Sequence, residues 1–242
     1  MKKILIAALA VSLAAATQVG AIVVNVSAIS GYYAPGSSGG EFNVTPITGA
    51  GYAPSVLVGG GFETFCAARN VNISIPGTYN AVVNANGSYI STLSPLTTAT
   101  ISSGTAYLYS RFATGVLNHY NYTGLGFNGS ANPATWLRGD SAYELQLAIW
   151  TLDLSYAYPD FTVNTFLNDI IGVGKQFASL AAAQAANAPA GYNVGTLNLS
   201  TIGNPSTPVQ SMLTLLPDGG TTLMLLGMGF SSLALVSRKI RA

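Results

Sequence analysis

The sequence has few of the residues that most catalytic and metal sites require. Only 7% of its 242 residues are charged, and it has one histidine, His119, and one cysteine, Cys66. Globular domains carry about 25% charged residues. One histidine excludes a histidine-rich metal site, and one cysteine excludes a disulfide within the chain. We therefore expect no cofactor, no metal ion and no enzymatic activity.

Basic charge is also scarce once the two ends are set aside. Five of the nine basic residues lie at positions 2, 3 and 238–241. The remaining body has four basic and seven acidic residues, a net charge of −3. A protein without a basic patch lacks the means to hold a phosphate backbone, so nucleic acid is not an expected partner.

The first 21 residues have the three parts of a secretory signal. Lys2 and Lys3 form a positive start, residues 4–16 are apolar, and residues 19–21 are small. The apolar run is too short to cross a bilayer, which favours a signal peptide removed by signal peptidase over the alternative of an N-terminal membrane anchor.

The C-terminal end has a second three-part pattern over residues 217–242. A polar motif formed by Pro217, Asp218, Gly219 and Gly220 precedes residues 221–237, which carry no charge, and a basic cluster follows. The uncharged stretch predicts a short transmembrane helix, and the basic cluster predicts a cytoplasmic end. A plain single-pass anchor is the simplest interpretation.

This tail resembles the sorting signals of PEP-CTERM proteins, most closely the VPDSG-CTERM variant, from which it departs at Leu216 and Gly219. The resemblance implies a Gram-negative envelope, recognition by an exosortase while the chain is transiently anchored in the inner membrane, and removal of the tail. The mature protein would then be secreted or held at the cell surface.

Residues 22–216 are enough for one well-packed domain, and their pattern predicts an α+β fold that is rich in strands and has a helical middle. We expect strands at residues 43–45, 55–58, 62–67, 79–84, 192–199 and 209–216. The Asn86–Gly87 pair predicts a tight hairpin turn.

Three helices are expected between these strands. Helical spacing predicts one over residues 105–114, and an Ala-rich stretch predicts another over residues 177–188. The clearest starts at a capping box of Ser141 and Glu144. There Leu145, Ala148, Ile149 and Leu152 repeat at the spacing of one buried face.

The lone cysteine admits three interpretations from the residues alone. Cys66 is a small buried apolar side chain, pairs with another molecule, or has a chemical role. The sequences Phe-Glu-Thr-Phe-Cys at 62–66 and Leu-Gln-Leu-Ala-Ile-Trp at 145–150 resemble the thioester (TQXA) domains of bacterial surface adhesins. The resemblance spans residues 62–153. It implies that Cys66 attacks the carboxamide of Gln146 and forms an internal thioester.

Such a bond must be shielded from water. Phe65 is the strand neighbour of Cys66, and Tyr143 and Trp150 lie at i−3 and i+4 from Gln146 on one helix face. We expect these three aromatic residues to protect the bond. The ligand would be a surface polysaccharide or protein.

Two other functions remain open. One is a passive structural or carbohydrate-binding matrix module, in which Cys66 is inert and tyrosines such as Tyr120, Tyr122, Tyr156 and Tyr158 either stack on sugars or fill the core. The other is a glycoside hydrolase using carboxylates among Asp153, Asp160 and Asp169, although their spacing fits the ends of helices and loops equally well.

Overall fold

The computed structural model describes residues 22–33, 39–48, 61–93, 95–157, 160–186 and 192–216. The expected signal peptide, the strand expected at 55–58, and the sorting motif with its transmembrane helix lie outside these residues. Within them, no helix is both long and apolar enough to cross a membrane.

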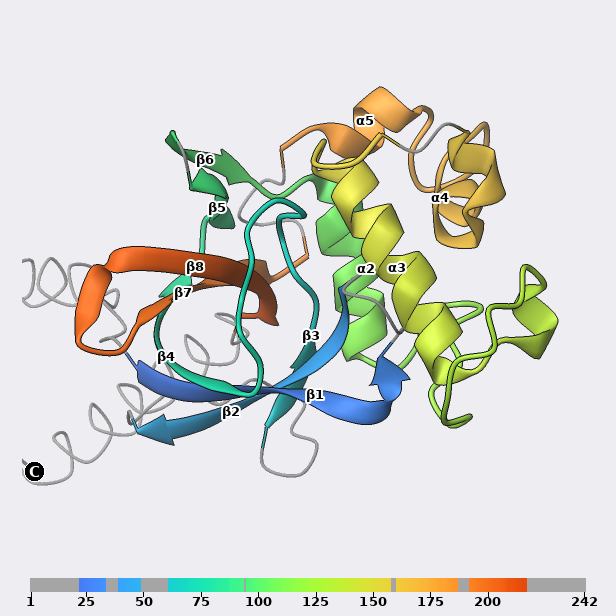
Figure 1. Cartoon of the computed structure of the whole chain (residues 1–242). Coiled ribbons are helices and arrows are strands. Elements are labelled where there is room, and N and C mark those ends of the chain that lie inside the picture. Colours follow the sequence, from blue (N-terminus) through green and yellow to red (C-terminus); the bar gives the residue numbers. More distant parts are fainter. Residues whose placement is uncertain are drawn as a thin grey trace, which may run out of the picture.

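Strands dominate the fold, and the expected β-rich α+β class is confirmed. Six antiparallel strands form the main sheet in the order β3-β2-β1-β4-β7-β8 (Figure 1). Two further strands, β5 and β6, form a separate hairpin. The strands are β1 Ile22–Tyr33, β2 Gly40–Thr48, β3 Phe62–Thr64, β4 Gly77–Asn84, β5 Ser88–Leu93, β6 Leu96–Thr100, β7 Val194–Thr201 and β8 Asn204–Leu215.

The central strand β1 was not among the expected elements. Ile22, Val24 and Val26 are buried while Asn25 between them is exposed, which is the alternation of a strand with one face in the core. The strand pairs with β2 on one side and β4 on the other. In the sequence it comes soon after the apolar run of residues 4–16, and the nearly continuous apolar pattern hides the alternation.

The chain beyond β3 closes the sheet on itself. Cys66 forms an isolated antiparallel bridge with Met212 of β8. The N–H of Ala67 donates to the Ser211 carbonyl at 2.9 Å, and the N–H of Leu213 donates to the Phe65 carbonyl at 3.1 Å. The first and last strands of the sheet therefore meet at Cys66.

The helices gather on one side of this sheet (Figure 1). They are α2 Ser103–Ala113, α3 Arg138–Leu152, α4 Thr165–Ile170 and α5 Leu180–Gln184, with single 3-10 turns at Pro133–Thr135 and Phe161–Val163. Helix α2 confirms the expected helix over 105–114 and is capped by Ser102. Helix α5 is shorter than expected, and α4 was not expected.

The start of α3 differs from the expected capping box. The helix begins three residues before Ser141, because the Asp140 carboxylate accepts the N–H of Leu137 at 2.8 Å and so caps the earlier turn. Glu144 instead accepts a bond from Asn164 at 2.8 Å. The helix is also buried almost all round, since it lies between β1 and β2 and the helices α2 and α4.

The tight turn at Asn86–Gly87 is present, with the Gly87 N–H donating to the Asn84 carbonyl at 3.1 Å. The turn does not join β4 and β5 into a hairpin, because β4 is already hydrogen-bonded to β1 on one side and to β7 on the other. Strand β5 therefore leaves the sheet and pairs with β6.

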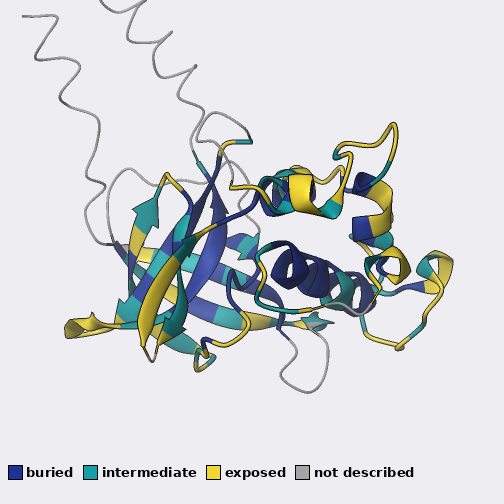
Figure 2. Ribbon diagram, turned by 90° about the horizontal axis from the view of Figure 1, so that it is seen from above, coloured by how far each residue is buried: buried dark blue, intermediate teal, exposed yellow. Residues whose placement is uncertain are grey.

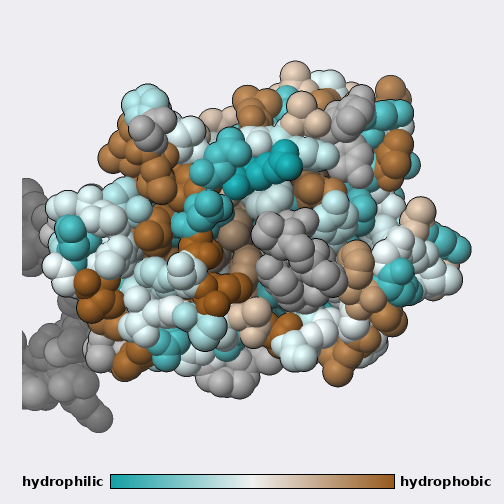
Figure 3. Space-filling view, viewed as in Figure 1, coloured by the Kyte–Doolittle hydropathy of each residue, from teal (hydrophilic) through white to brown (hydrophobic). Residues whose placement is uncertain are grey.

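The core lies between the sheet and the two long helices, where Figure 2 shows the buried residues concentrated. Figure 3 shows apolar residues gathered over the β5–β6 hairpin. Leu93 and Leu96 are the exposed leucines of that hairpin.

Candidate functional site

The bridge between Cys66 and Met212 of β8 orients the backbone N–H and C=O groups of Cys66 toward helix α3. In an antiparallel pair, successive residues direct their N–H and C=O groups to opposite sides of the strand. Since Phe65 and Ala67 bond to β8, the polar groups of Cys66 point the other way. There they meet Gln146. The Cys66 N–H donates to Gln146 Oε1 at 3.0 Å, and Gln146 Nε2 donates to the Cys66 carbonyl at 2.9 Å.

Two residues predicted as partners from distant segments, 80 positions apart, are thus in direct contact. Gln146 is fully buried, and Cys66 is 5% exposed. Gln146 is therefore not a surface residue of its helix. Its carboxamide forms the two hydrogen bonds to Cys66 that a neighbouring strand would otherwise form, at the point where the segment after β3 pairs with β8.

Gly39 covers the other side of this carboxamide. A Cβ atom at position 39 would lie 2.7 Å from Gln146 Cγ and 2.9 Å from the Trp150 ring, and the residue has a φ of +72°. Both the contact and the backbone conformation favour glycine here. Gly39, directly before β2, thus lies at close range to Gln146 and Trp150.

Cys66 is one of the residues that line a cleft of about 390 Å³. Burial raises the pKa of this thiol to about 12, and contact with the Gln210 side chain only partly opposes that rise. Two other buried polar atoms belong to residues that line the cleft, Trp150 Nε1 and Gln210 Oε1, and neither has a hydrogen-bond partner among the described residues. The residues beside the neutral thiol therefore carry one buried donor and one buried acceptor that are unpaired among the described residues.

The three expected shielding residues have different positions. Trp150 lines the cleft and touches Gly39, next to Gln146. The Phe65 ring packs edge-on against Phe112 of α2, with centroids 4.9 Å apart. Tyr143 packs edge-on against Phe127 at 6.3 Å. Only Trp150 is thus placed at the Cys66–Gln146 pair by these contacts.

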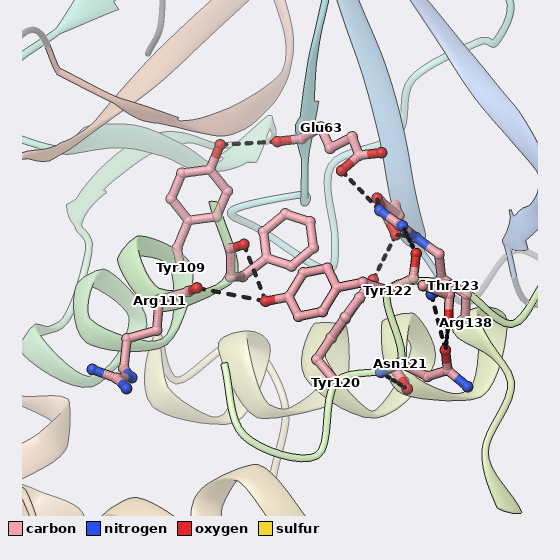
Figure 4. A network of polar contacts seen from close by, with 11 residues as sticks. Glu63, Tyr109, Arg111, Tyr120, Asn121, Tyr122, Thr123 and Arg138 are labelled. Atoms are coloured by element: carbon pink, nitrogen blue, oxygen red, sulfur yellow. Dashed lines mark hydrogen bonds and ion pairs between the residues drawn. The ribbon is translucent and has the colours of Figure 1, made fainter. Parts of the chain in front are cut away.

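A second polar cluster was missed by the sequence analysis (Figure 4). The Arg138 guanidinium donates from Nε to Glu41 Oε2 at 3.0 Å, and from one terminal nitrogen to Glu41 Oε1 at 2.6 Å and Glu63 Oε2 at 2.8 Å. Glu41 is fully buried and Arg138 is 5% exposed. The Tyr120 hydroxyl also donates to Glu41, and the Tyr32 ring lies 3.9 Å from the guanidinium carbon.

Burial and the neighbouring Glu41 carboxylate raise the pKa of Glu63 to about 7, although Arg138 opposes this. Burial and Glu41 likewise hold the pKa of Tyr120 well above its ordinary value. These residues come from β1, β2, β3, α3 and the loop before α3, so only the folded chain brings them together.

The remaining candidates do not form a site. His119 pairs with Asp169 at 3.2 Å at the surface. Asp153 is buried at the end of α3 and bonds to the start of α2, whereas Asp160 caps a surface turn. Among the described residues, no group of three or more His, Cys, Asp or Glu side chains is placed to hold a metal.

The tyrosines proposed as sugar-stacking residues divide between core and surface. Tyr120 is buried against Phe112, and Tyr156 stacks under the Arg69 guanidinium at 4.4 Å. Tyr122 is half-buried and donates to the Phe112 carbonyl. Tyr158 lies outside the described residues.

Comparison with known proteins gives no match: no family model, no curated protein and no solved structure matches this chain.

Proposed function

We propose that this chain is an exported cell-surface protein, processed by an exosortase, that attaches covalently to a surface ligand through an internal thioester. The bond would join Cys66 Sγ to Gln146 Cδ. One observation carries the proposal: the carboxamide of Gln146 is buried and held by both backbone groups of the only cysteine.

The hydrogen bonds suit the chemistry of bond formation. Attack of the thiol sulfur on Gln146 Cδ places negative charge on Oε1, which already accepts the Cys66 N–H at 3.0 Å. A backbone N–H aimed at such an oxygen stabilises the developing charge. The Nε2 group leaves as ammonia, taking the thiol proton, and the thioester remains.

Burial favours the product. A thiol whose pKa is raised to about 12 is almost entirely protonated at neutral pH, so formation is slow and should speed up as pH rises. Desolvation disfavours the thiolate but not the neutral thioester. The same burial keeps water from the acyl carbon.

The ligand would enter through the cleft beside Cys66. A hydroxyl or amine attacks Gln146 Cδ, an ester or amide bond forms, and the released sulfur takes the proton. Gln210 and Trp150 line this cleft, and their side-chain atoms Oε1 and Nε1 are buried without a hydrogen-bond partner among the described residues, so they could bond to an incoming group that reaches them. A surface polysaccharide or protein supplies such groups.

The end of the domain supports the proposed sorting. Strand β8 continues to Leu215, and the Leu216 N–H still donates to the Asn193 carbonyl at 2.7 Å. The motif formed by Pro217, Asp218, Gly219 and Gly220 follows at once. An exosortase that exchanges the tail would therefore leave the domain close to its attachment point.

A second function is favoured by one observation. Both polar ends of the Gln146 carboxamide are already satisfied by Cys66, as a purely structural bridge requires. The chain would then be a passive matrix module with an inert thiol.

Intact mass of the purified mature protein separates the two functions. A thioester makes the chain lighter by one ammonia, and methylamine then adds at Gln146. The matched controls are Cys66→Ala, which abolishes both effects, and Gln176→Ala, which removes an exposed glutamine and changes neither. An unmodified mass with no labelling at Gln146 would favour the structural bridge.

Sequencing of both ends of the secreted protein tests the sorting. We expect a new N-terminus near residue 22 and loss of the residues after the sorting motif. Secreted protein that retains residues 221–242 would contradict exosortase processing.

A further inference from the structure

A separate cavity of about 330 Å³ opens beside the Glu41–Arg138 pair. Its wall combines aromatic rings with one carboxyl group and one guanidinium. The residues that matter are Tyr32, Glu63, Tyr109, Phe112, Tyr122 and Arg138. Neither Cys66 nor Trp150 lines it, so it is distinct from the cleft at the candidate thioester.

The charges around this cavity do not balance. Glu41 has both oxygens occupied, by Arg138 and by the Tyr120 hydroxyl, and together with Arg138 it forms a neutral buried pair. Glu63 is the additional carboxylate: it lines the cavity, accepts one hydrogen bond from Arg138, and lies within hydrogen-bond reach of the Glu41 carboxyl group. The next cation along, Arg111 on α2, points away from Glu63 (Figure 4).

Among the residues that the structure describes, the other groups around Glu63 supply no further positive charge. Tyr109 of α2 donates its hydroxyl to the Glu63 carbonyl rather than to the carboxylate. The Tyr122 hydroxyl is committed to the Phe112 carbonyl. Tyr32 of β1 covers the face of Arg138. When Glu63 is ionised, the cluster therefore holds one uncompensated negative charge.

We propose that this cavity binds an alkylammonium group, either a lysine side chain or a free alkylamine, with its nitrogen against the Glu63 carboxylate and its methylene stem against the aromatic rings. An ammonium donates hydrogen bonds to a carboxylate, and the faces of tyrosine and phenylalanine rings attract cations. A neutral sugar would leave the carboxylate uncompensated, and an anion would be repelled by it.

Binding of a cation favours the ionised form of Glu63. The pKa of Glu63 is raised to about 7 by burial and by Glu41, while Arg138 lowers it. Below that pH the ammonium must displace a proton from the carboxyl group. Affinity should therefore fall by up to about tenfold for each pH unit below 7 and level off above it.

Calorimetric titration with n-butylamine and with Nα-acetyl-lysine methylamide tests the proposal. The full-length Cys66→Ala protein is used beside the wild type, so that covalent addition to a thioester cannot be mistaken for binding. We expect saturable binding of both probes, a loss of tenfold or more with 1-butanol, and proton release below pH 7. Preference for one probe distinguishes a free amine from a lysine side chain.

Two variants locate the binding. Glu63→Gln keeps the shape of the side chain but removes its charge, and should abolish the preference for butylamine over butanol together with the pH dependence. Ala113→Leu narrows the cavity from α2 without altering the charged cluster, and should weaken both probes.

Equal binding of butylamine and butanol would overturn the proposal, as would amine binding that Glu63→Gln leaves unchanged. Tighter binding of a neutral oligosaccharide such as cellotriose would overturn it too and would indicate a sugar site. None of these results depends on Cys66, so failure here is distinguishable from failure of the thioester.

Discussion

The side chain of Gln146 pairs with the backbone of Cys66 as an adjacent strand would. It accepts the Cys66 N–H at 3.0 Å and donates to the Cys66 carbonyl at 2.9 Å. A single residue of α3 thus completes the hydrogen bonding at the seam where β3 and β8 meet. The same contact can serve as a structural bridge or as the precursor of a thioester. Its contribution to stability and its contribution to thioester formation must therefore be measured separately.

Removing the carboxamide should destabilise the fold. In a Cys66→Ala background, where no thioester forms, Gln146→Ala leaves two buried backbone groups unpaired. Each such group costs about 1–3 kcal/mol, so we expect the free energy of unfolding to fall by about 2–6 kcal/mol. Urea unfolding measures it, and Gln176→Ala at the exposed position provides the control. A loss equal to that of the control would show that the backbone of Cys66 finds other partners.

A side chain at position 39 would cost stability in two ways, through steric contact with Gln146 and Trp150 and through the positive φ of the backbone. A comparison with Gly115 separates the two effects. Gly39 and Gly115 have nearly equal φ values, +72° and +73°, but a Cβ at Gly115 meets nothing within 4 Å. Gly115→Ala should therefore lower the free energy of unfolding by about 1 kcal/mol, because alanine is strained at a positive φ. Gly39→Ala must also displace Gln146 and Trp150, and we expect it to cost at least about 1 kcal/mol more.

Methylamine incorporation provides a second measurement on the same pair of variants. If a thioester forms, Gly39→Ala should reduce labelling at Gln146, because the carboxamide is displaced from Cys66, whereas Gly115→Ala should not. Equal unfolding free energies and equal labelling of the two variants would contradict the close packing of Gly39 on Gln146.

Elements with a local signal could be predicted from the sequence. The helix predicted over residues 105–114 and the strands predicted over residues 192–199 and 209–216 correspond to α2, β7 and β8, with bounds that differ by a few residues. Strand β1 could not be separated from the apolar run of residues 4–16 that precedes it. The β5–β6 pairing also had no local signal, since only the partners of β4 exclude the simpler hairpin.

The site was predictable only in part. Contact between Cys66 and Gln146 was expected from resemblance, not from spacing, because the two are 80 residues apart. Glu41 and Arg138 are 97 residues apart and lie in segments without any motif. Their one signal was scarcity: in a chain with so few charges, each charged residue is a candidate for a specific role.

The buried pair of Glu41 and Arg138 should matter more to stability than a surface ion pair. Arg138→Met leaves the Glu41 carboxylate buried without its cation, and breaking such a pair costs about 3–5 kcal/mol. The double variant Glu41→Gln/Arg138→Met should recover part of this loss, since it removes the unpaired charge. Arg111→Met, which changes a guanidinium at an exposed position, should change the unfolding free energy by less than about 0.5 kcal/mol.

Asp153 should make the fold less stable as pH rises from about 4 to 7. Its Oδ1 accepts bonds from the Ser102 N–H at 2.8 Å and the Thr105 hydroxyl at 3.0 Å, while Oδ2 has no partner among the described residues. Burial raises the pKa of this carboxyl from 3.8 to about 7. A raised folded-state pKa means that the folded chain binds the proton more tightly than the unfolded chain does. The stabilisation is therefore complete below pH 3.8 and is lost as pH rises to about 7.

The neutral variant Asp153→Asn isolates this effect from that of Glu63, whose raised pKa acts in the same direction. At pH 4 the variant and the wild type should have similar unfolding free energies. At pH 8 the variant should be more stable, by on the order of 2 kcal/mol, because it avoids burying a charge. Asp160→Asn, at a fully exposed capping position, serves as the control and should show no such gain. Parallel pH profiles for Asp153→Asn and the wild type would mean that Asp153 is ionised at little cost in the fold, with water or a rearranged donor satisfying Oδ2.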